Sequence, residues 1–262
     1  NLTGTTGAHE KSPAWSPDGK NIAWFSDESG EVQLVISPQD GKNPAKKYSL
    51  PGTGFYAFPE WSPDGKFLAF NDNGRNLYLF ETETGKSRKV DADEIYTPGP
   101  FREMNGSWSS DSRWLAYTKV TETQFRRIFI YSVEESKSYP VTDGLSDAGD
   151  PVFDPEGKYL YFLASTDAGP VINWFDQSNA DKRMTSSVYL VTLRKDIPHP
   201  FAKQSDEEKG VVKEEKKEGG QEKSSGSGSG KGKEAVDSKQ GKADAAEKVD
   251  KKINIDFDGM DS

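Results

Sequence analysis

Short runs of alternating apolar and polar residues recur along the chain, each separated from the next by a few turn-forming residues. The first repeat reads PAW, SPDG and KNIAWFS, and it continues through VQLVIS and KKYSL. Alternation with a period of two residues is typical of half-buried β-strands. Pro, Asp and Gly in SPDG favour a tight turn between two such strands. The pattern predicts an antiparallel sheet of four short strands.

The same pattern returns three more times at a nearly constant spacing. The aromatic residues before the first turn are Trp15, Trp61, Trp108 and Phe153, spaced by 46, 47 and 45 residues. A constant period in the mid-forties indicates stacked repeats, and four short strands per repeat are typical of a β-propeller blade. The sequence therefore predicts an all-β propeller region over residues 1–196, built of four four-stranded antiparallel blades that belong to a larger, seven-bladed ring. The blades are expected at about residues 13–50, 59–90, 106–141 and 151–196.

The aromatic residue before each turn is predicted to fill the wedge that opens between neighbouring blades. Trp15 and Trp61 should then be buried, whereas Ser16 and Lys20 in the turn should be exposed and tolerate replacement by Ala. The third turn, SSDS, lacks Pro and Gly, and the fourth repeat has Phe153 in place of Trp. These two turns are expected to be looser than the others.

The fourth repeat is interrupted by a tract rich in Lys, Glu, Gly and Ser. Residues 203–252 contain no Phe, Trp or Tyr, and such a composition buries too little apolar surface to offset the chain entropy. We therefore expect residues 197–252 to form a disordered insertion within the last blade. Residues 253–262, which begin INIDFDG, are expected to return as its outer strand. A surface insertion of this size is tolerable because loop-closure entropy grows slowly with length.

Charge and composition narrow the classes of partner. The net charge of −9 argues against a surface for nucleic acid or for anionic membranes. The chain has no Cys, which excludes disulfides and thiol chemistry, and no run is long enough to cross a membrane. We expect a cytoplasmic protein, with a periplasmic location as the alternative. Because the sequence begins without Met and in mid-pattern, we also expect it to be a piece of a longer protein.

The sequence offers few groups for catalysis. His9 lies beside Glu10, and His199 lies between two prolines; neither setting is typical of a positioned catalytic imidazole. No G-x-S-x-G motif occurs. We therefore assign no catalytic and no cofactor-binding residues.

The segment NIDFDG resembles the start of a calcium loop, with Asn254, Asp256 and Asp258 alternating before Gly259. A calcium loop continues to an acidic twelfth position between two helices, and neither feature is present in the pattern. Alternation is equally typical of a strand, so no metal ligand is predicted.

Two features are candidates for binding, with local surface packing as the alternative for both. The long loop 167–185 combines aromatic and cationic residues, and long loops tend to carry function. The run TETQFRRIF places Arg126 and Arg127 together, where they could contact the carboxylates of a peptide. The loop residues concerned are Trp174, Phe175, Lys182 and Arg183.

The repeat PxWSPDGKxIAF resembles the propeller repeats of the Tol-system periplasmic propeller, the prolyl-oligopeptidase-like peptidases and the tricorn proteases. PAWSPDGKNIAWFSDESGE, SSVYLVTLRKDIPHPFAKQSDEE and INIDFDGMDS together look like the second propeller of bacterial tricorn protease homologues. That resemblance implies a large oligomeric serine peptidase that degrades peptides, with the nucleophile in a separate domain. This chain would then be a noncatalytic propeller that serves substrate passage, sieving or scaffolding, although enzyme activity of the chain itself stays undecided.

Two other functions stay open at this point. The chain could be a protein-binding propeller of the Tol-system kind without any enzyme attached. It could also be the propeller of a prolyl-oligopeptidase-like enzyme, which would be followed by an α/β-hydrolase domain. The remainder of the open reading frame distinguishes the three.

Overall fold

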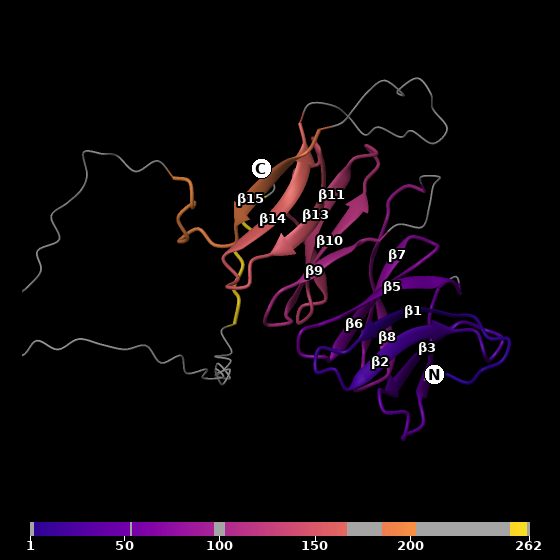
Figure 1. Ribbon diagram of the computed structural model, residues 1–262. Helices are drawn as coiled ribbons and strands as arrows, with labels where there is room; N and C mark the ends of the chain where they lie inside the picture. The colour runs from indigo at the N-terminus through magenta and orange to yellow at the C-terminus, as the bar shows by residue number, and fades with distance from the viewer. Residues whose placement is uncertain (1–2, 53, 97–102, 167–184, 203–251, 261–262) are drawn as a thin grey trace, which may run out of the picture. The chain divides into compact units, whose positions relative to one another are not determined.

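The computed structural model describes residues 3–52, 54–96, 103–166, 185–202 and 252–260 (Figure 1). The chain divides into one unit of residues 1–198 with 251–262 and a second unit of residues 199–250. In the second unit the described residues 199–202 form a turn, in which the Ala202 N–H donates to the His199 carbonyl oxygen at 3.0 Å. The described ranges contain no helix, and hence none that could span a membrane.

The described strands of the first unit form four antiparallel sheets, and each sheet consists of consecutive strands in chain order. This arrangement confirms the prediction of all-β propeller blades. The first sheet contains β1 (Glu10–Trp15), β2 (Asn21–Ser26), β3 (Gln33–Pro38) and β4 (Lys46–Ser49), and the second contains β5 (Tyr56–Trp61), β6 (Phe67–Asp72), β7 (Asn76–Glu81) and β8 (Lys86–Ala92). The third contains β9 (Asn105–Trp108), β10 (Trp114–Val120), β11 (Arg126–Ser132) and β12 (Lys137–Pro140), and the fourth contains β13 (Asp147–Phe153), β14 (Tyr159–Ser165) and β15 (Ser187–Thr192).

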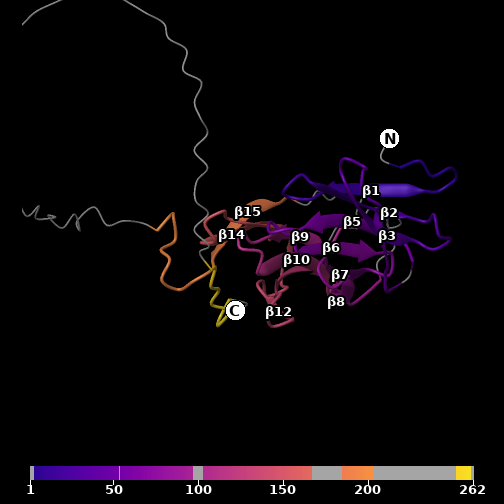
Figure 2. The same cartoon turned by 90° about the horizontal axis from the view of Figure 1, so that it is seen from below.

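Apolar cores join each sheet to the next one in the chain. Alternate residues of the inner strands point to opposite faces, so each central sheet contributes one set of side chains to the core on either side. Phe25 and Phe70 meet in the first core with ring centroids 5.9 Å apart. Ile130 and Leu160, both fully buried, lie in the core between the third and fourth sheets. Figure 2 shows the sheets in chain order, from β1–β3 to β14 and β15.

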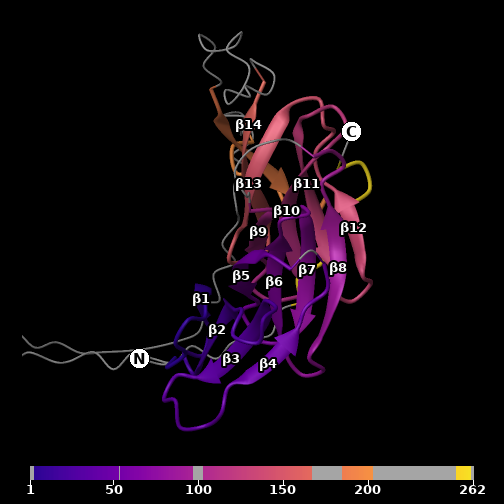
Figure 3. The same ribbon diagram turned by 90° about the vertical axis from the view of Figure 1, so that its right-hand side faces the viewer.

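The first strands of the sheets gather along one side of the unit. β1 contacts β5, and β9 contacts β13. In Figure 3 these four strands follow one edge of the sheets, and β4, β8 and β12 follow the opposite edge. Residues on the first strands of different sheets are therefore brought close together.

Each first strand contains a β-bulge that begins two or three residues before its end. Ser12, Phe58 and Asp150 adopt positive φ values of 52°, 54° and 54° at this place, and each precedes a proline. Pro disfavours the right-handed helical region for the residue before it, and the bulge supplies an unpaired position for the missing N–H. In β9 the extra residue is Gly106. The bulge is thus a recurring element of the repeat.

The turn after each first strand is organised by its serine, contrary to the expectation that Ser16 would be exposed. The Ser16 side chain is buried; its hydroxyl donates to Asp18 Oδ1 at 2.6 Å and accepts the Asn21 N–H at 2.9 Å. Ser62 and Ser109 make the same two contacts in the second and third turns. Because this network depends on Ser and Asp, the sequence pattern S-x-D closes the turn.

The third turn is therefore as regular as the first two, although it lacks Pro and Gly. The Ser112 N–H donates to the Ser109 carbonyl oxygen at 2.9 Å, and Ser112 itself adopts the positive φ of 62° that Gly has elsewhere. The Ser112 hydroxyl also accepts the N–H of Asp64 at 3.0 Å, which joins the second and third turns. The expectation of a looser third turn was wrong.

The aromatic residue at the end of a first strand is buried only where a preceding sheet packs against it. Trp108 is 8% exposed and stacks on Phe67 of the second sheet, and the partly buried Trp61 donates its Nε1–H to the Ala14 carbonyl oxygen at 3.2 Å. Trp15 is 58% exposed. The prediction of burial was wrong for Trp15 in this chain because no sheet precedes the first one among the described residues.

The fourth sheet has three strands in the described part of the chain, where four were expected. Residues 252–260, which we call the return segment, lie beside it as an irregular segment and not as the expected outer strand. The Asp256 N–H donates to the Leu193 carbonyl oxygen at 2.9 Å, just beyond the end of β15. Ile253 is held by the third sheet instead, since its N–H donates to Asp111 at 2.7 Å and its carbonyl oxygen accepts the Trp114 Nε1–H at 2.9 Å. The return segment therefore crosses between two sheets and cannot pair along one edge.

Candidate functional site

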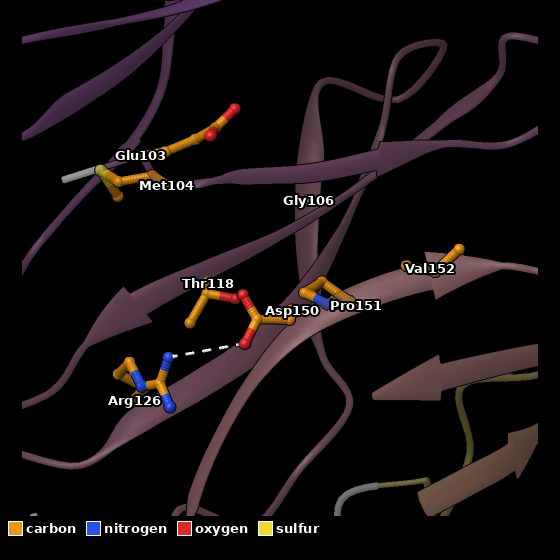
Figure 4. A pocket seen from close by; sticks show the side chains of 8 residues that line it. All are labelled: Glu103, Met104, Gly106, Thr118, Arg126, Asp150, Pro151 and Val152. Carbon is orange, nitrogen blue, oxygen red and sulfur yellow. Dashed lines mark ion pairs between the residues drawn. The ribbon is translucent and has the colours of Figure 1, made fainter. Parts of the chain in front are cut away.

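A cavity of about 350 Å³ lies where the third and fourth sheets meet. Its walls come from the first strands β9 and β13 and from the facing ends of β10 and β11 (Figure 4). It thus lies where the first strands gather. The residues that line it are Glu103, Met104, Gly106, Thr118, Arg126, Asp150, Pro151 and Val152.

An arginine–aspartate pair fixes the floor of the cavity. Arg126 Nε and Nη2 donate to Asp147 Oδ2 at 3.0 and 2.7 Å, and the Arg126 backbone N–H donates to Asp147 Oδ1 at 2.8 Å. Asp147 is only 4% exposed. Burial by itself would lower the pKa of Arg126, but the hydrogen bonds and the charge of Asp147 outweigh it and raise that pKa above its usual value. The guanidinium is therefore a permanent, oriented cation.

Two glycines allow the close packing around this pair. A Cβ at Gly149 would lie 2.6 Å from Arg126 Nη1, and a Cβ at Gly106 would lie 2.5 Å from the Pro151 side chain. Both distances are far below van der Waals contact. The guanidinium therefore lies directly over the backbone of β13, and β9 lies directly against Pro151.

Several polar atoms stay available to the cavity. Arg126 Nη1 lies 3.9 Å from Asp150 Oδ2, an ion pair too long for a hydrogen bond (Figure 4). Thr118 is 6% exposed, and among the described residues its hydroxyl has no hydrogen-bond partner. The Asp150 side chain is 67% exposed. The cavity thus presents two donors and one carboxylate acceptor toward its interior.

The two arginines of the run TETQFRRIF do not form the joint carboxylate contact that the sequence suggested. Arg126 faces the cavity, where Asp147 and Asp150 surround it. Arg127 donates through Nε to the Thr142 carbonyl oxygen and lies over the Phe129 ring at 5.6 Å. A free carboxylate near Arg126 would meet more negative than positive charge, so this hypothesis is not supported.

Neither histidine contacts a serine hydroxyl within the described ranges. The His9 backbone N–H donates to Asp27 Oδ1 at 2.6 Å. His199 Nδ1 accepts the Phe201 N–H at 3.1 Å. His9 is thus held through its backbone, and the His199 imidazole lies in a local turn contact.

The acidic residues of the NIDFDG run attach the return segment to Lys195. Asp256 accepts the Lys195 N–H at 3.1 Å, and Asp258 forms an ion pair of 2.8 Å with the Lys195 ammonium. Gly259 has a φ of 77° in the closing turn. In the part of the chain that the structure describes, no group of three His, Cys, Asp or Glu side chains is placed to hold a metal ion.

The other candidates fall largely outside the described residues. Of the loop 167–185, the structure describes only Thr185, so Trp174, Phe175, Lys182 and Arg183 lie outside it. Most of the predicted disordered insertion, residues 203–251, also lies outside the described ranges.

Sequence reasoning missed the cavity itself. Arg126 was a candidate, but Thr118, Asp147 and Asp150 were not. One signal was present: the residue three positions before the aromatic is followed by Pro in the first, second and fourth repeats. A recurring X-Pro inside a strand indicates a bulge, and bulges often re-aim side chains next to functional sites.

Comparisons with known proteins agree with the fold. A family model described as "Tricorn protease second beta propeller domain" matches residues 1–262. The "Uncharacterized peptidase YuxL" of Bacillus subtilis (strain 168) is 30% identical over an alignment of 158 residues, and the match covers 58% of this chain and 21% of that protein. The "Putative Tricorn-like protease C-terminal subunit" of Sulfurisphaera tokodaii is 30% identical over 103 residues, 39% of this chain and 11% of that protein.

The crystal structure of the tricorn protease is similar with a TM-score of 0.58 and 20% identity, over 73% of this chain and 18% of that one. At this identity the likeness shows the fold alone. The chain spans about a fifth or less of the length of each of these proteins. The full-length family match, together with the four sheets and their order, shows that the chain belongs to the family of tricorn protease second beta propeller domains.

Proposed function

We propose that this chain is a noncatalytic propeller portion of a tricorn-type serine peptidase and that it guides peptides toward a catalytic domain elsewhere in the parent protein. Its partners would be peptide substrates and the remaining domains of that protein, within a homo-oligomer in the cytoplasm. Scaffolding without any contact to substrate is the competing role.

The observation that carries the proposal is the gathering of the first strands, combined with the polar cavity on that same side. β1 contacts β5, and β9 contacts β13, and the cavity is lined by residues of β9 and β13. Propeller blades surround a central channel. First strands that line such a channel would be the surface a passing peptide meets.

The exposed faces at both ends of the described sheets support a larger ring. Trp15 on the first sheet is 58% exposed, and Val152 and Val188 on the fourth are 52% and 72% exposed. In the stacked sheets, the residue equivalent to Trp15 is covered by a preceding blade. Further blades of the same kind would cover these faces and close the ring, which we propose to be seven-bladed.

A blocking experiment on the full-length parent peptidase tests the passage. Because this chain has no Cys, a single Cys can be placed at the cavity as Glu103→Cys, at an exposed residue just before β9, in a parent variant without other cysteines. A polymer attached at this Cys should slow the hydrolysis of long peptides several-fold and leave that of very short ones nearly unchanged. The matched control is Lys42→Cys in the exposed turn between β3 and β4, labelled in the same way.

Equal effects at both positions, or no effect at Glu103→Cys, would contradict passage on this side of the blades and favour scaffolding. Slower hydrolysis of peptides of every length at Glu103→Cys alone would indicate damage to the fold. A melting curve of the labelled protein identifies that case.

A further inference from the structure

We propose that the cavity between β9, β11 and β13 binds the uncharged main-chain amide of an extended peptide. This inference rests on the proposed function only in taking peptides as the ligand class. The site itself follows from the atoms that line the cavity and from their missing partners.

Two hydrogen-bond donors, Arg126 Nη1 and the Thr118 hydroxyl, point into the cavity and have no hydrogen-bond acceptor among the described residues. Asp147 occupies Nε and Nη2 of Arg126, which leaves Nη1 directed at the space in front of Asp150. The Thr118 hydroxyl is the second donor, on a side chain that is more than nine-tenths buried. An acceptor such as a peptide carbonyl oxygen would give these donors a partner, and such hydrogen bonds favour binding.

The acceptor of the site is Asp150, whose carboxylate lies 3.9 Å from Arg126 Nη1. A group that accepts from Arg126 and at the same time donates to Asp150 must carry both functions a few ångströms apart. The amide of a peptide main chain has this property. Figure 4 shows the Thr118 hydroxyl, the Asp150 carboxylate and the Arg126 guanidinium directed toward one another.

The charges of the cavity disfavour simpler ligands. A carboxylate would lie near Arg126 but also near Asp147 and Asp150, and these three side chains together carry more negative than positive charge. An ammonium would attract Asp150 but would be repelled by the guanidinium and could accept from neither donor. A neutral amide avoids both penalties.

The site is rigid enough to select a backbone. Met104 is 1% exposed and Pro151 is buried, and Asp150 is held at a positive φ of 54° by the bulge. The ion pair with Asp147 fixes the Arg126 guanidinium in one orientation. A volume of about 350 Å³ lies at the small end of the range of ligand pockets, which suits a short stretch of main chain.

The test is a titration of the ¹⁵N-labelled chain with an N-acetylated, C-amidated Ala-Gly-Ala-Gly peptide, followed by NMR. We expect saturable shifts of the Met104, Thr118 and Asp150 amide signals. Thr118→Val should weaken binding about fivefold, the effect of one lost hydrogen bond, and Asp150→Asn should weaken it by a similar factor. The matched controls Thr84→Val and Asp40→Asn, on exposed turns of other sheets, should leave the affinity unchanged.

The signals of the other sheets show whether a variant has kept its fold, and the two test variants are independent of one another. Shifts confined to other regions, or an affinity unchanged from that of the original chain in both test variants, would overturn the proposal. Binding only to a peptide with a free amino terminus, or only to one with a free carboxylate, would overturn it as well, because the site would then recognise a charge.

This outcome is separable from the proposed function. The cavity experiment measures binding to this chain alone, whereas the polymer experiment measures peptide hydrolysis by the parent. If peptides pass the blades but do not bind in the cavity, the polymer slows hydrolysis and the titration shows no binding. If they bind in the cavity but do not pass the blades, the titration shows binding and the polymer has no effect.

Discussion

At the scale of single residues, the serine of the S-x-D turn is a structural position and not a surface one. The Ser62 side chain is fully buried; its hydroxyl donates to Asp64 Oδ1 at 2.6 Å and accepts the Phe67 N–H at 3.0 Å. We expect Ser62→Ala to lower the free energy of unfolding by about 1–3 kcal/mol, because a buried N–H loses its acceptor. Urea denaturation measures the change.

The control for this prediction is Lys66→Ala in the same turn, whose side chain is 71% exposed. It should change the free energy of unfolding by less than about 0.5 kcal/mol. Equal losses in both variants would show that the hydroxyl is not what closes the turn.

The equivalent tryptophans should respond differently to truncation. Trp108→Ala removes a ring that is 8% exposed, and such losses typically cost about 3–5 kcal/mol. Trp15→Ala, at 58% exposure, should cost less than about 1 kcal/mol in this chain. Denaturant midpoints of the two variants settle the comparison, and a larger loss at Trp15 would contradict the exposed position described here.

A buried tyrosine makes the free energy of unfolding depend on pH in the alkaline range. Burial first, and then the charge and hydrogen bond of Asp72, raise the pKa of Tyr78 from 10.0 to about 12. The fold therefore favours the neutral phenol, and this contribution is complete below pH 10 and is lost as the pH rises through about 12. Tyr78→Phe should lose less free energy of unfolding than the unchanged chain between pH 9 and 11.5.

Urea denaturation at the two pH values measures this difference. Tyr96→Phe, at a tyrosine that is 72% exposed, is the control and should behave like the unchanged chain. The same pH dependence in Tyr78→Phe would show that Tyr78 does not contribute to it.

At the scale of elements, strands and turns could be predicted from the sequence because their signals are local. Alternation and SPDG-type turns fix where each strand begins and ends, and the spacing of the aromatics fixes the order of the sheets. The cavity could not be predicted in the same way. The cavity depends on Asp150 of β13 facing Arg126 of β11. These residues belong to different sheets, and no local sequence pattern indicates that they meet.

For the return segment, the sequence predicted the location correctly but not the secondary structure. INIDFDG lies beside the fourth sheet, as expected, but it does not pair as a regular strand because Asp111 and Trp114 hold Ile253 to the third sheet. We expect Ile253→Ala to cost about 2–5 kcal/mol, since the side chain is 6% exposed in a shared core. The melting temperature should fall accordingly by many degrees.

By contrast, replacement of residues 205–249 by a shorter Gly-Ser linker should change the melting temperature by only a few degrees, roughly the effect of 1 kcal/mol. The composition of this tract offers little apolar surface to a core. Loss of folded protein in the deletion variant, with Ile253 intact, would show that the tract contributes structure.

At the scale of the whole molecule, the features that we connect with function lie in the first unit. This unit contains the sheets, the cavity and the return segment, and it would make the proposed contact with peptides. The further blades that we propose would cover its two exposed end faces. The proposed passage is therefore a property of the assembled ring, whereas the amide site is a property of this chain.

The return segment also has a consequence for a nicked chain. Ile253 is buried, Phe257 stacks on Tyr139 with ring centroids 4.0 Å apart, and Lys195 forms an ion pair with Asp258. A protease that cuts only between residues 203 and 250 would sever the covalent connection but leave these contacts in place. The cut would turn an intramolecular contact into a bimolecular one, so the small fragment would stay bound at high protein concentration and be lost on dilution.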